Sequence, residues 1–550
     1  MGRSADGSDG GSGMTLADNR ADVVVVGGGL AGISAAIELA EAGLAVMLLE
    51  ARPWLGGATW SFARRGLTID NGQHAFIRGC EAYRDLLAKL GVLSSVAIQD
   101  RLDLTVLGAA SHQAPFSQLA LRRSGLPAPL HLATALAGYR HLTGAERVKA
   151  GAAALALQLT GLRRGAGREQ SFGEWLVQHG QDENARRMFW DLLSVAGLGL
   201  PSGEADLGLA AAAIRAALAG RRNADIGIPV APLSRLHASP VVTLLNRLGS
   251  RILLGVRASA CRLSRSGGYE VVVAPAAPSS AAPASSARPR VVQAAAVVLA
   301  VPAWEAAALA PAELAADAAA WARLTPSPVV SLHVFYASKV TSLPFAAVVD
   351  SPVRWVIDKT GPAGLHAGQY LAASVPAADK FVDLPSSRLR AELLPELDRL
   401  FPAAIDAEVE DFFTTRERRA FIRQIPGTAR LRARPPVLRG LAVAGAWTDT
   451  GWPDTMEGAV RSGLGAAWKV LSDVGGSGVA NSGADAYSAD ACGADTYSTG
   501  GLAGYATGGV ATSGLATSGV APSSDAPSSD GVAADGAEPG GPITSLAPAQ

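Results

Sequence analysis

The pattern of hydrophobic and polar positions over residues 21–50 predicts a strand, a helix and a second strand. Val23–Val26 are four consecutive β-branched residues, which is typical of a strand buried on both faces of a parallel sheet. The next segment has apolar residues at helical spacing, namely Leu30, Ile33, Ile37 and Ala40. Gly43 is placed to end that helix, and Ala45–Leu49 is the second strand. This succession predicts a βαβ unit of an α/β fold.

The same patterns predict that the first domain resumes later in the chain and that a second sheet lies between its parts. Fully buried strands are expected at 297–301 and 441–445. Alternating strands of the second sheet are expected at 327–336, 353–358, 369–375 and 408–413. Helices are expected at 80–90, 171–180, 183–200, 387–400 and 457–470.

Glycines at the end of the first strand provide the first candidate chemistry. Gly27, Gly29 and Gly32 form G-x-G-x-x-G, in which the first glycine permits a tight turn and the second lets the backbone approach a pyrophosphate. The third lets the helix pack closely on the strand. The helix N-terminus, at Leu30 and Ala31, offers free amides to phosphate oxygens. Glu50 ends the second strand, where an acid can accept hydrogen bonds from ribose hydroxyls, so we predict a dinucleotide site.

A second glycine pair shortly after the acid bears on whether the dinucleotide is FAD or NAD. This extension resembles flavoproteins of the amine oxidase and phytoene desaturase superfamily, in which the glycine loop passes beside the pyrophosphate. The resemblance implies cofactor contacts from Glu50, Ala51, Arg52, Gly56, Gly57 and Ala58. The superfamily usually has Arg where this chain has Ala58. One phosphate contact is therefore missing or is replaced by a nearby arginine, with Arg52, Arg64 and Arg65 as the candidates.

Composition excludes several classes of function. The 550 residues include 48 basic and 48 acidic side chains, so nothing global points to a nucleic-acid partner. Three cysteines lie far apart without metal spacing, which fits a reducing cytosol and predicts no metal site. Residues 1–20 are polar and glycine-rich, unlike a signal peptide, and no uncharged apolar run reaches transmembrane length. We therefore expect a cytoplasmic protein.

These segments predict an α/β chain with a Rossmann-type FAD-binding domain, an interleaved substrate domain of mixed sheet plus helices, and two disordered tails. The expected FAD-binding parts are 21–115, 237–310 and 436–472, and the substrate-binding parts are 116–236 and 311–435. Residues 1–20 form a leader and residues 473–550 a low-complexity tail that cannot bury enough apolar surface to fold. Residues 274–289 are a low-complexity surface insertion.

Residues 118–165 differ from the rest because they are apolar and basic, with Glu146 as the single acid. Two prolines break the pattern, and two helices are predicted to follow. One interpretation is a helical cap of the substrate domain. The other is a helix pair that lies on an anionic membrane surface, with basic side chains outside and apolar ones below. The protein would then be peripheral on the inner face of the cell membrane.

The second candidate chemistry is the stretch 445–463. A buried strand ends at Gly445, a loop follows, and a helix begins near Thr455, so that the amides around Met456 face a partly negative group. In flavoproteins this group would be the pyrimidine edge of the flavin. The superfamily usually has Asp after the glycine, where it reaches the ribityl hydroxyls, but this chain has Ala446. We expect backbone amides and Asp449 to compensate.

Two motifs make the resemblance closer. DNGQH at 70–74 and AGAWTDTGWPDTMEGAVRSG at 444–463 resemble the squalene-associated FAD-dependent desaturases, a family of hydroxysqualene dehydroxylases. SPVVSLHVFY and LPFAAVVDSPVRWVIDKTG are similar to the middle region of that family, so the likeness spans about residues 22–471. The resemblance implies FAD, a long-chain isoprenoid substrate and an external electron donor. It also implies reductive removal of an allylic hydroxyl, with hydride supplied from the flavin.

That reaction needs an acid near the leaving hydroxyl. The candidates are His74, which either donates as an imidazolium or only hydrogen-bonds the backbone, and Asp449, which either donates or caps the loop. Gly72 and Val256 complete the expected cofactor contacts. Two alternatives stay open: a carotenoid or polyene desaturase that runs flavin chemistry in the oxidative direction, and a lipid-binding protein that keeps flavin as a structural element.

Overall fold

The computed structural model describes residues 19–108, 117–159, 169–276, 289–434 and 438–474. Most of the predicted leader, of the insertion at 274–289 and of the tail lies outside these residues. Asp473 belongs to the folded part, because its Oδ2 accepts the Gly440 N–H at 2.7 Å and its backbone oxygen accepts Arg439 Nε at 2.8 Å. The tail boundary expected at residue 473 is therefore too early, since apolar periodicity does not reveal a polar anchor.

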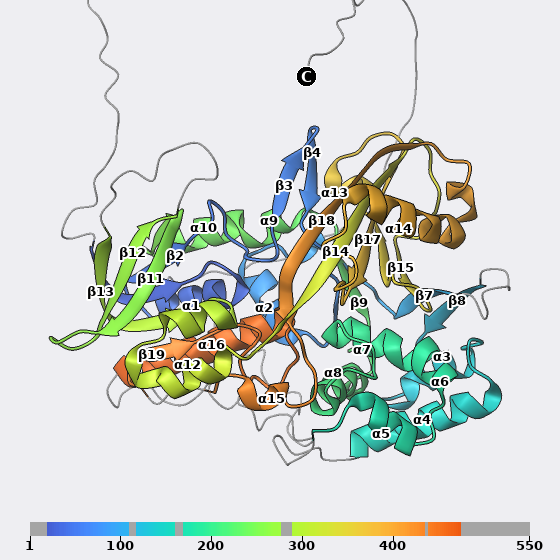
Figure 1. Cartoon of the computed structure of the whole chain (residues 1–550), viewed down its shortest axis with the longest axis horizontal. Helices are drawn as coiled ribbons and strands as arrows, with labels where there is room; N and C mark the ends of the chain where they lie inside the picture. Colours follow the sequence, from blue (N-terminus) through green and yellow to red (C-terminus); the bar gives the residue numbers. More distant parts are fainter. Residues whose placement is uncertain (1–18, 109–116, 160–168, 277–288, 435–437, 475–550) are drawn as a thin grey trace, which may run out of the picture. The chain divides into compact units, whose positions relative to one another are not determined.

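The first sheet joins segments from the two ends and the middle of the chain (Figure 1). Its strands are β1 (Arg20–Val26), β2 (Val46–Glu50), β10 (Arg251–Leu254), β11 (Val256–Leu263), β12 (Tyr269–Pro275), β13 (Arg290–Leu299) and β19 (Leu441–Val443). The order is β10-β2-β1-β13-β12-β11, and β19 pairs with β13. The pairs β2–β10, β1–β2, β1–β13 and β13–β19 are parallel, so the carboxyl ends of these strands share one edge of the sheet.

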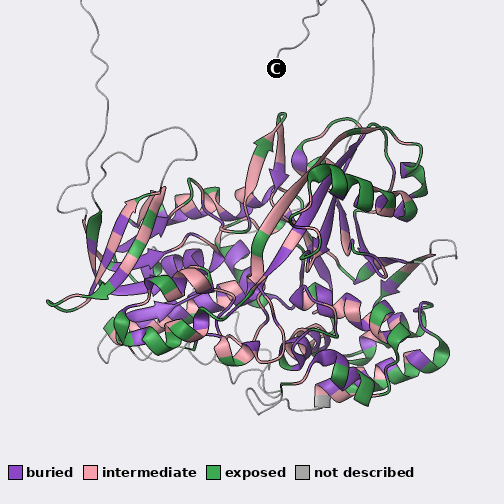
Figure 2. Cartoon of the chain, in the orientation of Figure 1, coloured by how far each residue is buried: buried purple, intermediate pink, exposed green. Residues whose placement is uncertain are grey.

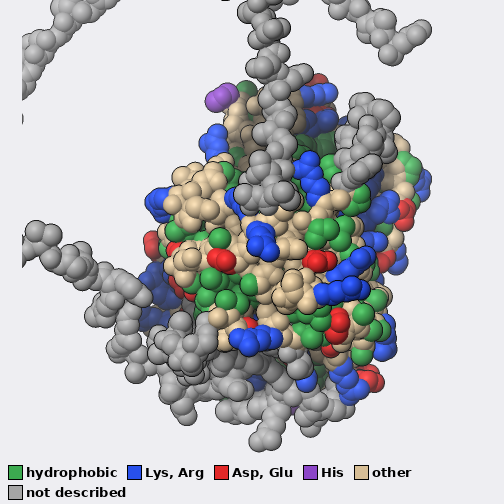
Figure 3. Space-filling view, turned by 90° about the vertical axis from the view of Figure 1, so that its left-hand side faces the viewer, with side chains coloured by type: hydrophobic (Ala, Val, Ile, Leu, Met, Phe, Trp, Pro, Cys, Tyr) green, Lys and Arg blue, Asp and Glu red, His purple; other side chains and the backbone are tan. Residues whose placement is uncertain are grey.

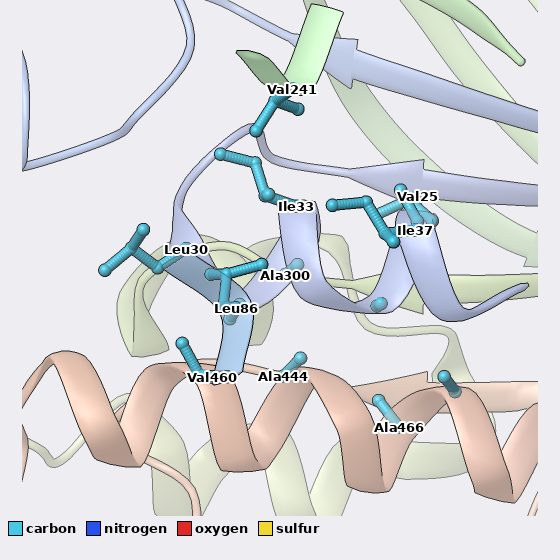
Figure 4. Packing of buried hydrophobic residues seen from close by; sticks show 14 of the residues in the cluster. Val25, Leu30, Ile33, Ile37, Leu86, Val241, Ala300, Ala444, Val460 and Ala466 are labelled. Carbon is cyan, nitrogen blue, oxygen red and sulfur yellow. The ribbon is translucent and has the colours of Figure 1, made fainter. Parts of the chain in front are cut away.

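Helices pack on both faces of this sheet. One face packs against α1 (Leu30–Glu41), α2 (Glu81–Lys89), α10 (Ser239–Arg247) and α16 (Met456–Val474), and the other against α11 (Ala303–Leu309) and α12 (Ala315–Trp321). Strand residues point alternately to the two faces, so Val25 joins the α1 cluster whereas Val24 joins the α11 cluster. Figure 4 shows α1 and α16 within the first cluster. Gly463 permits their close approach, because a Cβ there would lie 2.2 Å from the Ala31 oxygen.

The second sheet contains the four strands predicted from the middle of the chain and three that were not assigned to it. Its order is β18-β14-β17-β16-β15-β7-β8. The bounds are β7 (Asp103–Gly108), β8 (Ser117–Arg122), β14 (Pro326–Tyr336), β15 (Phe345–Val348), β16 (Trp355–Asp358), β17 (Gln369–Pro376) and β18 (Val409–Ile422), with α13 (Thr360–Ala363) and α14 (Ser386–Leu400) beside them. The sequence placed β7 in the first domain, but it pairs with β15 and β8.

A small hairpin connects the two sheets. Its strands are β3 (Ser61–Arg64) and β4 (Leu67–Asp70), and its apolar side chains join a cluster with Phe335 and Tyr370 of the second sheet. A short sheet, β5-β9-β6, follows with strands β5 (Phe76–Ile77), β6 (Val96–Ile98) and β9 (Ile226–Pro229). Figure 2 shows buried residues concentrated in the strands and in the helices between them. The DNGQH segment begins at Asp70, the last residue of this hairpin, and so starts where the hairpin packs against the second sheet.

The remaining helices form a cap beside β8. They are α3 (Ala133–Ala137), α4 (Gly144–Leu159), α5 (Phe172–Gln178), α6 (Glu183–Ala185), a π-helical turn (Arg186–Trp190), α7 (Asp191–Leu198) and α8 (Leu207–Ala219), while α9 (Leu233–His237) and α15 (Thr428–Leu431) lie elsewhere. The sequence did not predict α8, α11 or α12. Among the described residues, no helix combines the length and the apolar character that a membrane span requires.

Charges on the surface are mixed. On the face shown in Figure 3, Lys and Arg side chains are interspersed with Asp, Glu and hydrophobic ones. Arg123, counted among the basic residues of 118–165, does not belong to the surface. It is 6% exposed and forms a bidentate ion pair with Asp225, at 2.5 and 3.0 Å. Its charge therefore stabilises the cap from within and cannot contact a membrane.

Candidate cofactor and active site

The glycines after β1 are required by close backbone contacts. Gly27 has φ +108°, and a Cβ there would lie 2.2 Å from the Ala300 oxygen of the neighbouring strand end. A Cβ on Gly32 would lie 1.8 Å from the Gly27 oxygen, so the third glycine lets α1 rest on the turn. Gly29 differs, because its nearest neighbour is the Gly57 Cα at 3.9 Å. Gly29 thus leaves open space where the motif predicts a pyrophosphate.

The second glycine pair closes over the first motif. Gly56 N–H donates to the Gly28 oxygen at 2.8 Å, and a Cβ on Gly57 would lie 2.9 Å from the Gly29 Cα. Arg52 Nη1 donates to the Gly57 oxygen at 3.0 Å. The two loops therefore form one cradle with a bare backbone wall, which is the surface that a bulky phosphate group requires.

Glu50 fixes the turns on either side of it. Its Oε2 accepts the Gly28 N–H at 2.7 Å and its Oε1 accepts the Arg52 N–H at 2.7 Å, and the residue is 9% exposed. Val256 lies beside this turn, since Gly255 N–H donates to the Arg52 oxygen at 3.1 Å. Glu50 therefore stands at the strand end where the sequence expected a ribose contact.

Of the three arginines considered for the missing phosphate contact, only Arg52 hydrogen-bonds the cradle among the described residues. Arg64 and Arg65 lie at the tip of the β3–β4 hairpin and pair with Asp411 of β18, at 3.1 and 3.4 Å. Ala58 is exposed and supplies no side-chain donor. The N-terminus of α1 has no side-chain cap, so the amide dipoles at Leu30 and Ala31 add to the charge of Arg52 in favouring an anion in the cradle.

The C-terminal loop begins beside the cradle. Ala444 N–H donates to the Leu299 oxygen at 2.9 Å, and Trp447 Nε1 donates to the Val301 oxygen at 2.9 Å, on either side of the Ala300 that contacts Gly27. Gly445 has φ +147° and donates its N–H to Ser462 Oγ of α16 at 2.8 Å. Both predicted motifs thus meet at the carboxyl ends of β1 and β13, where ligands of open α/β sheets bind.

A buried arginine that the sequence did not indicate fixes this loop. Arg432 is 3% exposed, and its Nη2 donates to the oxygens of Ala446 at 2.8 Å and Thr448 at 2.6 Å. Its Nε donates to the Trp447 oxygen at 3.3 Å. The loop backbone around Ala446 is therefore held by a guanidinium, although the side chain that usually reaches the ribityl chain is absent.

Glu457, one residue into α16, connects that helix to α2. It is 1% exposed and accepts the N–H groups of Ala82 at 3.2 Å and Tyr83 at 2.8 Å, and Arg461 Nε at 2.6 Å. Burial raises the pKa of the Glu457 carboxyl, and the hydrogen bonds with Arg461 and α2 oppose that shift. Its role is to fix the start of α16, and with it the Met456 amide, against the rest of the site.

The DNGQH segment is anchored by a buried ion pair. Lys359 Nζ donates to Asp70 Oδ2 at 2.9 Å, and both side chains are 4% exposed. Asp70 Oδ1 accepts Ser61 Oγ at 2.7 Å and the Leu233 N–H at 3.0 Å. Gln73, three residues on, has both side-chain polar atoms enclosed without a hydrogen-bond partner among the described residues. An enclosed amide without partners costs about 1–3 kcal/mol, so it is suited to a ligand that both donates and accepts.

The histidines around this segment are held neutral. Burial lowers the pKa of His74, whose Nδ1 donates to the Gly72 oxygen at 3.0 Å, so that Nε2 carries the lone pair at neutral pH. Burial also lowers the pKa of His333 to about 3. Thr415 Oγ1 donates to the Asn71 oxygen at 2.8 Å, so His333 Nε2 donates to Thr415 and Nδ1 accepts from the Tyr370 hydroxyl at 2.6 Å. This directional chain connects DNGQH to the second sheet.

Two aspartates lie in the C-terminal loop. Asp449 donates its N–H to the Ala433 oxygen at 2.7 Å and directs its carboxylate toward Arg434, at 3.8 Å. Asp454 accepts the Ile422 N–H at 2.7 Å, and burial raises its pKa to about 6. The motif in the sequence contains Asp454, but the burial that raises its pKa is visible only in the folded chain.

The residues present fit a dinucleotide flavin. Four features suit such a cofactor: the open backbone at Gly29, the uncapped amides of α1, the acid at Glu50 and the unpartnered Gln73 amide. The segments that carry them are connected, because the backbone oxygen of Trp60 accepts the Asn71 N–H at 2.9 Å and the Trp60 ring stacks on Trp54 at 4.6 Å. No group of three or more potential metal-ligating side chains occurs among the described residues.

Comparisons with known proteins agree with this geometry. The family described as flavin containing amine oxidoreductase matches residues 30–471. Proteins named hydroxysqualene dehydroxylase from Rhodopseudomonas palustris and Sinorhizobium fredii are each 29% identical and each match 82% of this chain, with 98% and 99% of their own lengths covered. The zeta-carotene desaturase of Solanum lycopersicum is 31% identical over 188 residues, which is 32% of this chain and 30% of its own.

Solved structures support the fold. An oxidoreductase from Methanosarcina mazei has a TM-score of 0.62 at 18% identity, with 80% of this chain and 99% of that chain covered. A triple mutant of putrescine oxidase has a TM-score of 0.60 at 18% identity, with 82% and 99% covered. These similarities confirm the predicted α/β architecture with its interleaved second sheet.

Proposed function

Since the chain belongs to the flavin containing amine oxidoreductase family and is an FAD-dependent oxidoreductase, we propose that it converts hydroxysqualene to squalene by reductive removal of the hydroxyl group. The observation that carries this proposal is the nearly full-length match to two proteins named hydroxysqualene dehydroxylase. The carotene desaturase match covers only about a third of each chain.

The cofactor would be held by backbone at one end and by the C-terminal loop at the other. Gly29 and Gly57 would leave room for the pyrophosphate, and Glu50 would face the ribose. The loop at Ala446 and the amide of Met456 would face the ribityl chain and the pyrimidine edge. In its reduced form FAD supplies the hydride that completes the reaction, with electrons from an external donor.

The second sheet provides the apolar side of the site. Phe335 and Tyr370 stack at 4.3 Å, and Phe413 stacks on His333 at 4.5 Å, which gives a buried aromatic cluster beside the DNGQH segment in which Phe413 is the partly exposed member. Aromatic faces suit an isoprenoid chain and stabilise positive charge that develops on it. At neutral pH, Nε2 of the neutral His74 would accept a hydrogen bond in this site, so we assign His74 to positioning the substrate hydroxyl.

Product analysis tests the proposed reaction. The purified protein with FAD, a chemical reductant and hydroxysqualene in detergent should form squalene under anaerobic conditions, and protein stripped of FAD should form none. Equal squalene formation with and without the protein would contradict the proposal.

A polyene desaturase is the second candidate, because the zeta-carotene desaturase of Solanum lycopersicum is 31% identical to this chain over 188 residues. This enzyme would need oxidised FAD and a polyene, and it would produce a longer conjugated system. Incubation of the oxidised protein with phytoene or ζ-carotene and a quinone acceptor should leave the polyene spectrum unchanged if the dehydroxylase proposal is correct. A red shift of that spectrum would favour the desaturase.

We also propose that the cap contacts a lipid surface, since the substrate dissolves in membranes. Val148 and Leu155 lie about two turns apart on α4 and are 75% and 49% exposed, and Leu126 and Leu130 add 45% and 56% exposed side chains. Arg140 and Lys149 are exposed in the same part of the chain. Apolar side chains flanked by basic ones are typical of helices that lie in the interface of anionic membranes.

Vesicle co-sedimentation tests this contact. Binding to vesicles that contain anionic lipid should weaken in Val148→Gln/Leu155→Gln and with added salt, because the Coulombic part is screened over about 10 Å at 0.1 M salt. Ile405→Asn, at a 67% exposed position outside the cap, is the control. Unchanged binding of the double variant would identify the helices as an ordinary cap.

A further inference from the structure

Asp454 occupies the junction between the two sheets. It lies in the loop between β19 and α16, two residues before Met456. Its Oδ2 accepts the N–H of Ile422, the last residue of β18, at 2.7 Å, and its own N–H donates to Gln424 Oε1 at 2.8 Å. Figure 1 shows β14 and β18 running from the second sheet toward α16. The carboxyl is thus fixed where the predicted flavin edge meets the substrate side.

The other acids of the two motifs are already engaged. Asp70 is paired with Lys359, Glu457 accepts three donors, and the nearest cation to Asp449 is Arg434. Asp454 forms no ion pair within 4.0 Å in the part of the chain that the structure describes. Because the Ile422 amide engages Oδ2, the proton of the acid form resides on Oδ1, which has no hydrogen-bond partner among the described residues.

The surroundings of Asp454 keep its acid form populated to a higher pH than is usual for an aspartic acid. Burial is the main cause of its raised pKa, and the Ile422 N–H and the positive charge of Arg432 oppose it. Asp206, on the other side of Arg432, is also influenced by this cation. Arg423 on the adjoining strand end is engaged by Asp379 and Glu204. Asp454 nevertheless retains intermediate exposure, so part of the carboxyl faces accessible space.

We propose that Asp454 is the proton donor to the hydroxyl group that leaves the substrate. This inference rests on the dehydroxylase function proposed above. The Oδ1–H bond breaks and its proton binds the hydroxyl oxygen, after which the C–O bond breaks and both its electrons leave with water. The allylic carbon is left cationic and is reduced by a hydride that comes from the reduced flavin, with an external reductant restoring the electrons. Asp454 returns to the acid form with a proton from solvent.

A leaving-group experiment separates proton donation from a structural role. With hydroxysqualene, Asp454→Asn should lower kcat by at least about 100-fold, the usual contribution of a positioned acid, while Asp454→Glu retains part of the rate. The acetate ester of hydroxysqualene expels a carboxylate that needs no proton, so Asp454→Asn and wild type should reduce it at rates within about threefold. Asp383→Asn, at a 74% exposed position outside the two motifs, is the control and should process both substrates as wild type does.

The pH profile gives a second signature. The acid form of Asp454 is needed, so the hydroxysqualene rate of wild type should be high below pH 6 and fall as pH rises through about 6. The ester rate should lack that decline. Loss of activity on both substrates in Asp454→Asn, together with a wild-type hydroxysqualene rate that does not fall through pH 6, would assign Asp454 to structure and overturn the inference.

Infrared titration of the FAD-free protein provides a readout independent of turnover. A carboxylic acid C=O band that disappears as pH rises through about 6 should be present in wild type and in Asp383→Asn and absent in Asp454→Asn. Persistence of that band in Asp454→Asn would assign it to another acid and overturn the inference. Failure of wild type to produce squalene would refute the proposed function, whereas an active wild type with a fully active Asp454→Asn would refute this inference alone.

Discussion

The two halves of the proposed cofactor site are built in different ways. The cradle at Gly27–Gly57 is backbone packed on backbone, and its critical positions are those where a side chain would collide. The C-terminal loop at 445–455 is held by long-range side chains, above all by Arg432, which gathers three of its carbonyl groups. The first half depends on steric exclusion over short sequence distances. The second depends on charged hydrogen bonds between distant segments.

This difference predicts how each half fails when it is changed. A side chain introduced in the cradle would occupy the space of the cofactor, so FAD binding should be lost completely. At a glycine with open space around it, such as Gly29, the fold should stay intact. A change around the C-terminal loop leaves buried polar groups without partners, so the effect is graded and appears in stability as well as in FAD affinity.

The largest effect is expected for Gly29→Val. The backbone at Gly29, with φ −77° and ψ 177°, accepts any residue, and the new side chain enters open space beside Gly57. The variant should fold and purify without its yellow colour, measured as the ratio of absorbance at 450 and 280 nm. Gly125→Val, at a loop position without close neighbours, is the control and should retain FAD. Stoichiometric FAD in Gly29→Val would remove the pyrophosphate from this cradle.

Arg432→Met should be the most damaging change on the other side. Three carbonyl groups would lose a buried donor, which should lower the free energy of unfolding by roughly 3–5 kcal/mol and weaken FAD binding. Arg434→Met changes a side chain that is 76% exposed and should stay within about 0.5 kcal/mol. Urea unfolding with and without FAD measures both. Equal stability of the two variants would show that Arg432 does not organise the loop.

A smaller effect concerns pH. The pKa of His333 is about 3 when folded and near 6.5 when unfolded, so the unfolded chain binds more protons between these values. The contribution of the neutral His333 imidazole to the free energy of unfolding is complete above pH 6.5 and is lost as pH falls toward 3. Between pH 7 and pH 5 the loss should be about 2 kcal/mol. His333→Gln should flatten the unfolding curve by that amount, and an unchanged pH dependence would contradict the burial argument.

Structure could be predicted from the sequence where the interacting residues lie close together in the chain. The strand at Val23–Val26, its glycine turn and the following helix lie within 25 residues, and the structure places them as the pattern predicts. β18 was expected to end at residue 413 but continues to Ile422, because charged residues on its outer face obscure the alternation. The sequence gives no local sign that Arg123 is buried, since its partner Asp225 is about 100 residues away.

The same reasoning explains what was missed in the site. Glu457 and Asp454 stand inside a motif that the sequence singled out, yet their roles follow from α2 and β18, which lie far away in the chain. Arg432 occurs in a region with many arginines and carries no distinguishing pattern. Its function depends on burial against Ala446–Thr448, which is decided only when the two domains fold together.

The smallest effect tests how the loop manages without its usual acid. Ala446→Asp would add a carboxylate next to the predicted ribityl position, and the Asp449 carboxylate lies 3.8 Å from Arg434. We expect FAD to bind roughly three- to tenfold more tightly, since a charged hydrogen bond is partly offset by desolvation. Apoprotein titration measures it. Weaker binding that Asp449→Ala restores would show that Asp449 already makes the contact.

The most direct test of the account is an anaerobic single turnover. Protein with its FAD reduced is mixed with one equivalent of hydroxysqualene, and the absorbance at 450 nm is followed together with the extracted lipid. The account predicts that the oxidised flavin spectrum returns and that squalene appears in equal amount, with no such change after mixing with squalene itself. A flavin that stays reduced in the presence of hydroxysqualene would contradict the proposed reaction.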